Sequence, residues 1–201
     1  MMILANGMLI FGGVVLGVIL IFGVWLIMTY NRFVSIRQHL KESWSDVDVE
    51  LKRRYDLIPN LISTVKGYAD HEKSLFMEVT EARTKAMENT GSPDSQSGDE
   101  QKLVRGVGRL LAVAEQYPDL KASANFLELQ DELSNTEDRI AAGRRFYNAN
   151  VREMNQLCTT FPSNLVGGMF GFKSEGFFEV GNAGEREVPK ALMDSPGAKP
   201  E

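Results

Sequence analysis

The chain is poor in the residues that build disulfides, metal centres and nucleophilic active sites. Its 201 residues include one cysteine, Cys158, and two histidines, His39 and His71. One cysteine excludes an intramolecular disulfide and a thiolate metal cluster, and we expect Cys158 to pack as a small buried residue. Neither histidine has the spacing that a zinc protease or a di-iron bundle requires, since Leu75 takes the place of a second zinc ligand after His71. We therefore expect no enzymatic activity, no metal and no cofactor.

A surplus of basic residues is also absent. The chain carries 22 Lys and Arg against 27 Asp and Glu, a net charge of −5. Proteins that bind nucleic acids usually present a basic face, and no run in this sequence is both basic and interleaved with aromatic residues. We therefore expect no nucleic-acid partner.

No charged side chain precedes Arg32. Residues 8–30 form an apolar run that makes a helix of roughly 34 Å, enough to cross a hydrocarbon core of ~30 Å. A cleaved secretory signal would instead have a basic start, a shorter apolar core and a small-residue cleavage site, whereas residues 1–7 hold no Lys or Arg. The sequence predicts a retained transmembrane helix over 8–30 that contacts the lipid bilayer, after a short extracytoplasmic N-terminus over 1–7.

The first cations after this run indicate the orientation of the chain. Arg32, Arg37 and Lys41 follow the run closely, and such residues are enriched on the cytoplasmic side of a span. Trp25 and Tyr30 suit the aromatic belt at that inner boundary. We expect a single-pass protein with its N-terminus outside and its remaining domain in the cytoplasm.

Apolar residues recur in steps of three and four after the span, which is the period of a helix. The series comprises Phe33, Ile36, Leu40, Trp44, Val47, Leu51, Ile58, Ile62 and Val65. No strand-like alternation appears. Because no Gly or Pro separates Tyr30 from Leu57, the span is expected to continue into this helix and to bend at Pro59.

Further helices are expected along the rest of the chain. Their approximate ranges are 71–89, 99–117 and 124–160, and Asp70 is the expected N-cap of the first of them. The polar, Gly- and Ser-rich stretch 88–100 is expected to be a mobile loop, and residues 181–201 a disordered tail. The predicted fold class is all-α: an N-terminal single transmembrane helix followed by a long antiparallel up-and-down bundle of three to four helices over 31–180.

One segment gathers the polar residues that could form an interaction site. Arg53, Arg54, Asp56 and Asn60 surround Pro59 in the middle of the predicted long helix. In one interpretation they form a solvated helix face, and Asp56 or Asn60 binds the backbone groups that Pro59 frees. In the other they form a polar hinge where a partner docks, with Arg53 or Arg54 pairing a carboxylate.

Small and aromatic residues at the two ends of the chain offer two more contacts. Gly13 and Gly17 form a G-x-x-x-G pattern, whose small residues let two lipid-embedded helices approach closely. This pattern makes a homo-oligomer possible. After the last predicted helix comes an aromatic cluster, which we expect to pack on the bundle rather than in the membrane interface or a partner groove. Its members are Phe170, Phe172, Phe177 and Phe178.

Several long blocks of the sequence resemble the LemA family of bacterial membrane-anchored proteins. The longest block is residues 43–72, which contains LKRRYDLIPNLISTVKGY. The others are 81–83, 110–122, 125–130, 136–141, 144–148, 161–165 and 170–172. The resemblance covers about residues 30–180 and implies a helix-bundle domain behind one anchor in the bacterial cell (inner) membrane, and it carries over no functional residue.

These observations favour a non-enzymatic interaction or scaffold protein, which binds unknown protein partners or its own copies. The alternative is an accessory regulator of a membrane protease or transporter.

Overall fold

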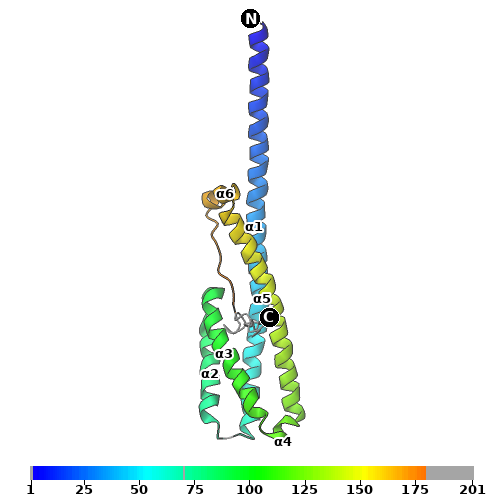
Figure 1. Ribbon diagram of the computed structural model, residues 1–201, viewed down its shortest axis with the longest axis vertical. Helices are drawn as coiled ribbons and strands as arrows, with labels where there is room; N and C mark the ends of the chain where they lie inside the picture. Colours follow the sequence, from blue (N-terminus) through cyan, green and yellow to red (C-terminus); the bar gives the residue numbers. More distant parts are fainter. Residues whose placement is uncertain (1, 70, 180–201) are drawn as a thin grey trace, which may run out of the picture.

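The computed structural model describes residues 2–69 and 71–179, and over these residues every regular element is a helix (Figure 1). The elements are α1 (Met2–Lys66), α2 (Lys73–Glu88), α3 (Pro93–Ala114), α4 (Pro118–Lys121), α5 (Ala124–Thr159) and α6 (Ser163–Phe170). The prediction of an all-α protein is confirmed. Asp70 and the expected tail 181–201 lie outside the described residues, whereas residues 2–7 belong to α1. The expected helix start at residue 71 is wrong, because α2 begins at Lys73 with Glu72 as its N-cap.

Helix α1 runs without a break through the apolar run, the cationic segment and Pro59. It is the one helix in the described part of the chain that is long and apolar enough to cross a membrane. No residue of its apolar window is buried by the rest of the protein, and Figure 1 shows this part standing clear of the other helices. The second half of α1 forms one wall of the core.

The principal packing partner of α1 is α5, and the two helices lie side by side along the second half of α1 (Figure 1). Val47 and Leu51 on α1 and Val151 and Met154 on α5 are almost fully buried. The two helices lie close together at Gly143, where an added Cβ would lie 2.9 Å from Val47 Cγ2. The predicted end of the last helix, near residue 160, agrees with α5.

Helices α2 and α3 form a second pair that packs against α1. The expected mobile loop over 88–100 is wrong, because α3 begins at Pro93 and only residues 89–92 separate the two helices. Proline fits the first turn of a helix, where its missing N–H costs no hydrogen bond. The polar residues that suggested a loop bond to one another: Asn89 Nδ2 donates to Asp99 Oδ2 at 2.9 Å, and Gln96 Nε2 donates to the Gly91 carbonyl at 2.8 Å.

The chain turns back after α5 through α6 and an extended segment over residues 172–179. Gly171 ends α6 with φ of 71°, a left-handed conformation that glycine adopts without a steric penalty. The extended segment then descends beside α5 toward α3 (Figure 1). Phe172 and Phe178 are buried, so these two members of the aromatic cluster pack on the helices.

Candidate functional site

The polar segment around Pro59 contains a buried ionic network that joins three helices. The Arg54 guanidinium on α1 donates to Glu137 Oε1 on α5 at 2.7 Å and to Glu100 on α3. The Tyr55 hydroxyl donates to the other carboxylate oxygen of Glu100. Arg54 and Glu100 are essentially without solvent exposure. Four side chains therefore fix the relative positions of α1, α3 and α5.

Burial and charge act against each other within this network. Burial raises the pKa of Glu100 above its ordinary value, although Arg54 and Tyr55 oppose the shift. Burial alone would lower the pKa of Arg54, but the Glu100 and Glu137 carboxylates raise it. Burial and Glu100 also raise the pKa of Tyr55. A buried charge is costly unless it is paired, so each member of the network depends on the others.

The backbone carbonyl that Pro59 leaves without its helical partner belongs to Tyr55. Proline has no N–H to donate to the residue four positions before it. The Arg83 side chain on α2 supplies the missing donor, with Nε 2.6 Å from the Tyr55 carbonyl oxygen. The expectation that Asp56 or Asn60 would bind this group is wrong, because the donor comes from another helix.

The structure separates the four residues predicted as an interaction site. Arg54 is buried and bonded inside the protein, so it does not belong to an exposed docking surface. Arg53, Asp56 and Asn60 are exposed on α1. Arg53 Nε lies 3.8 Å from Glu50 Oε2, a neighbour on the same helix. Three other helices complete this polar region with residues that the sequence did not predict: Arg83 on α2, Glu100 on α3 and Glu137 on α5.

Two asparagines on α5 hold the extended segment by its backbone. Asn155 accepts a hydrogen bond from the Glu175 amide at 2.7 Å and donates to the Glu175 carbonyl at 3.0 Å. Asn148 makes the same pair of bonds with Phe178, both at 3.0 Å. Phe178 is fully buried and its ring meets Trp44 edge-on, with centroids 5.1 Å apart. The sequence offered no periodic signal for these contacts.

At the end of α5 that lies farther from α4, α6 packs against α1 near the end of the apolar run. Phe172 stacks on Phe33 with ring centroids 4.5 Å apart, and Phe170 lies 4.8 Å from Tyr30. Arg37 also contacts this cluster, with its guanidinium carbon 4.2 Å from the centre of the Phe172 ring. These contacts place α6 at the level where α1 changes from apolar to charged.

The glycines predicted for helix association lie on an uncovered part of α1. A Cβ added at Gly13 or Gly17 would meet no atom within 4 Å. Cys158 is half-buried, and burial raises the pKa of its thiol above the ordinary value, which disfavours the reactive thiolate. No group of potential metal ligands occurs among the residues that the structure describes.

Together these features define an all-helical protein with one candidate membrane-spanning helix near its N-terminus. The LemA family model matches residues 43–191, most of the chain beyond the apolar run, and the chain belongs to the LemA family.

Known relatives agree with this assignment. The chain is 28% identical to Magnetosome protein MamQ 2 of Paramagnetospirillum magneticum and 26% identical to Magnetosome protein MamQ of Magnetospirillum gryphiswaldense, each match covering 81% of this chain and 69% of the relative. It is also 28% identical to Protein LemA of Metamycoplasma hominis, over 68% of this chain and 62% of that protein.

Proposed function

We propose that this protein is a non-enzymatic interaction module, anchored in the bacterial inner membrane by a single pass of α1. Its N-terminus lies outside, and its helices project into the cytoplasm as one antiparallel up-and-down bundle that binds other proteins or further copies of the chain. The observation that carries the proposal is the long apolar part of α1, which no other part of the protein buries.

The polar chemistry of the bundle supports contact rather than catalysis. The most deeply buried charges, Arg54 and Glu100, pair with each other. Arg54 also pairs with Glu137, and Glu100 accepts a hydrogen bond from Tyr55. Such a network fixes the packing of helices, and none of its four members is left as a free acid, base or nucleophile. The proposed work of the protein therefore lies on its surface and in the membrane.

The anchor itself offers a surface for assembly. Gly13 and Gly17 are four residues apart on one face of α1 and have open space around them. Lipid-embedded helices associate through such small residues because their backbones can come close together. We propose that this face brings two anchors into contact.

Cysteine crosslinking of the full chain in native membranes tests this assembly. Asn6→Cys, in a chain with Cys158→Ala, should give dimeric adducts that Gly17→Ile strongly reduces. Val15→Ile is the matched control, because it enlarges a side chain on the opposite face of the same turn and should leave the adducts unchanged. Equal adducts in all variants contradict assembly through the glycines. One adduct with a different protein, without self-adducts, supports the accessory regulator.

The orientation has its own test. Arg32, Arg37 and Lys41 follow the apolar run and favour a cytoplasmic bundle. A reporter enzyme that is active only outside the cytoplasm, fused after Glu201, should be inactive. Activity of this fusion would contradict the proposed topology.

A further inference from the structure

We propose that residues 161–170, which we call the interfacial segment, form a second contact with the membrane at the boundary between headgroups and acyl chains. The segment comprises the turn before α6 and α6 itself. The proposal rests on the proposed function, in which α1 spans the bilayer. It adds a lipid-binding surface that belongs to the bundle and not to the anchor.

Helix α6 lies beside α1 at the end of the apolar run. The ring of Phe170 lies 4.8 Å from that of Tyr30, the residue at the end of the apolar run. The helix is held there closely, because a Cβ added at Gly167 would lie 3.1 Å from Phe33 Cζ. A span of ~20 residues crosses the hydrocarbon core, so a span that ends at Tyr30 puts α6 beside the lipid surface.

The outer face of the interfacial segment is apolar. Val166 and Gly167 face inward and are buried. The large apolar side chains that remain exposed are Phe161 at 75%, Leu165 at 59%, Met169 at 70% and Phe170 at 45%. Exposed apolar groups that gather in one place on a protein usually mark a binding surface. Four of them lie within this ten-residue segment.

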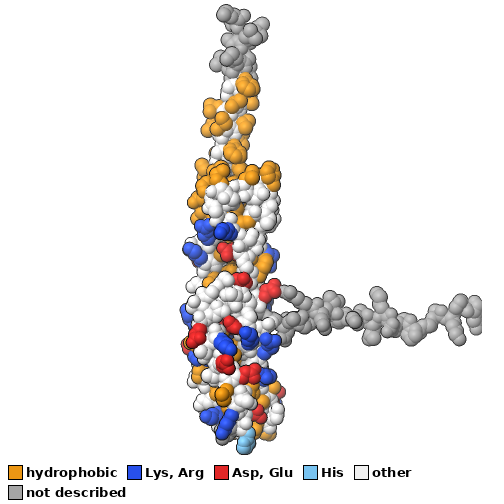
Figure 2. All heavy atoms as spheres, turned by 90° about the vertical axis from the view of Figure 1, so that its left-hand side faces the viewer, with side chains coloured by type: hydrophobic (Ala, Val, Ile, Leu, Met, Phe, Trp, Pro, Cys, Tyr) orange, Lys and Arg blue, Asp and Glu red, His pale blue; other side chains and the backbone are white. Residues whose placement is uncertain are grey.

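The interfacial segment lies within a stretch of the chain that carries no charged side chain. Residues 154–172 contain no Asp, Glu, Lys or Arg, and the flanking charges are Glu153 and Lys173. Arg32, the first charged side chain of α1, pairs with Glu153 across a distance of 2.9 Å. The charges on α1, on α5 and after α6 therefore begin near one level. Figure 2 shows apolar side chains on α1 and on the adjoining end of the bundle, with Lys and Arg side chains just below them.

This layout favours lipid over a protein partner as the occupant. An interfacial element buries apolar side chains among the acyl chains and keeps cations at the headgroups. Arg37 and Lys173 are placed for the second role, since one lies over the Phe172 ring and the other follows that residue directly. The apolar face of the segment is also continuous with the apolar surface of α1 that the bilayer would cover.

Fluorescence quenching in nanodiscs tests the proposal. The full chain with Cys158→Ala is incorporated at one copy per disc into phosphatidylcholine and phosphatidylglycerol, so that contacts between copies are absent. A single cysteine replaces Met169 and carries an environment-sensitive fluorophore. Met77→Cys on α2 is the matched control, because Met77 and Met169 are exposed to nearly the same extent, 73% and 70%. Val18→Cys reports on the span itself.

Nitroxide lipids, labelled near the top of the acyl chain, should quench the probe at 169 severalfold more than the probe at 77, and aqueous iodide should show the reverse order. Iodide quenching at 169 as strong as at 77, together with lipid quenching at 18, overturns the interfacial segment but leaves the anchor in place. Iodide quenching at 18 as well overturns the membrane span and, with it, the proposed function.

Discussion

At the scale of single residues, the ionic network makes a sharp prediction about Arg54. Arg54→Met leaves the Glu100 carboxylate buried without its cation, and breaking a buried pair in this way costs about 3–5 kcal/mol. We expect this loss in the free energy of unfolding of the full chain in detergent micelles, measured by urea titration and circular dichroism.

Arg53→Met is the control for Arg54→Met. It removes the same charge one position earlier, where the side chain is 46% exposed, and exposed pairs contribute at most about 1 kcal/mol. Equal destabilisation by the two variants would show that the buried network contributes no more to the free energy of unfolding than an exposed ion pair does.

Tyr147 gives a prediction about alkaline pH. Its hydroxyl donates to the Gly176 carbonyl at 3.1 Å, and burial, with smaller effects from Glu175 and Asp94, raises its pKa to about 12. The unfolded chain releases this proton near pH 10, so the folded state binds more protons above that pH. The free energy of unfolding should therefore fall as pH rises from 10 to 12, by up to ~1.4 kcal/mol per pH unit from this group.

Urea titrations between pH 8 and 11.5 check this decline. In Tyr147→Phe the loss above pH 10 should be shallower, because the titrating group is gone. Tyr68→Phe, which alters an exposed tyrosine, should keep the slope of the unmodified chain. A slope that Tyr147→Phe does not change would place the alkaline sensitivity elsewhere.

At the scale of elements, Pro59 and Arg83 form a compensating pair between α1 and α2. Arg83→Met should destabilise the protein by about 1–3 kcal/mol, because the Tyr55 carbonyl loses its donor in a partly buried place. In a Pro59→Ala background the new amide can donate to this carbonyl within the helix, and Arg83→Met should then cost clearly less. A double-mutant cycle measured by urea unfolding gives the coupling directly.

A control for this cycle is Arg109→Met on α3. Arg109 is 57% exposed and pairs with Glu78 on α2, so its loss should cost the same with and without Pro59. Additive effects of Arg83→Met and Pro59→Ala would mean that Arg83 does not replace the missing helical donor.

The elements also show what the sequence can and cannot predict. The long apolar periods of α1 and α5 set their extent, because a helix with a continuous apolar stripe is stabilised by whatever packs on it. The stretch 88–100 predicts a loop because it has no apolar stripe. In the structure its polar groups bond to one another, and Glu100 bonds to Arg54. The extended segment 172–179 shows no apolar periodicity, and hydrogen bonds from Asn148 and Asn155 on α5 determine its position.

Among the residues of the ionic network, likewise, the sequence predicts the burial of one but not the roles of its partners. Arg54 lies three residues after Leu51 and four before Ile58, within a buried stripe, so its burial had a signal in the sequence. Its partners Glu100 and Glu137 had none, because they are distant in the chain and look like ordinary acidic residues of solvated helices. Their roles come from the packing of α3 and α5 on α1.

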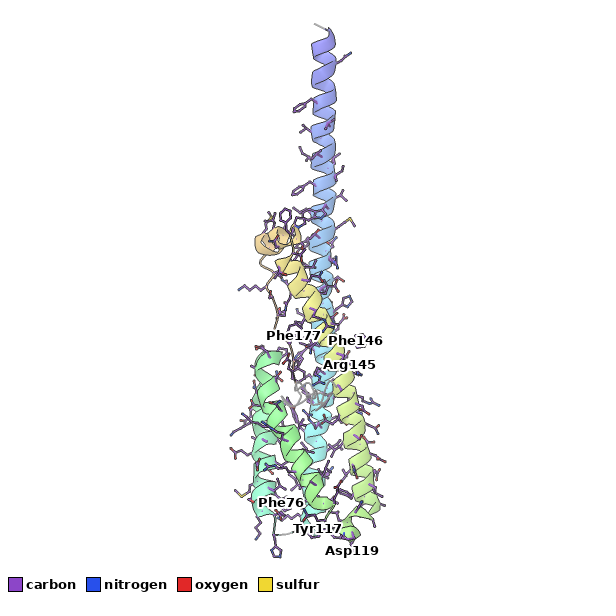
Figure 3. The ribbon with its side chains drawn as sticks, in the orientation of Figure 1. Phe76, Tyr117, Asp119, Arg145, Phe146 and Phe177 are labelled. Atoms are coloured by element: carbon purple, nitrogen blue, oxygen red, sulfur yellow. The ribbon has the colours of Figure 1, made fainter. Side chains whose placement is uncertain are left out.

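At the scale of the whole molecule, the proposed anchor and the length of α1 predict how far the bundle stands from the membrane. From Tyr30 to Lys66 the helix rises by about 54 Å at ~1.5 Å per residue. Figure 3 shows Phe146 partway along the bundle and Phe76, the neighbour of Met77, near its far end. Positions 169, 146 and 77 therefore form a series of increasing distance from the lipid surface.

Energy transfer to an acceptor on the lipid headgroups measures this series. With Cys158→Ala, donors on single cysteines at 169, 146 and 77 should show transfer efficiencies that fall in that order, because position 77 lies roughly 45–50 Å from the surface in an upright bundle. A bundle that lies flat on the membrane would give similar efficiencies at 146 and 77. An upright bundle presents the whole length of α2, α3 and α5 to partners in solution, whereas a flat bundle would restrict the partners of these helices to lipids and membrane proteins. The order of the transfer efficiencies therefore decides which kind of partner the surface of the bundle can reach.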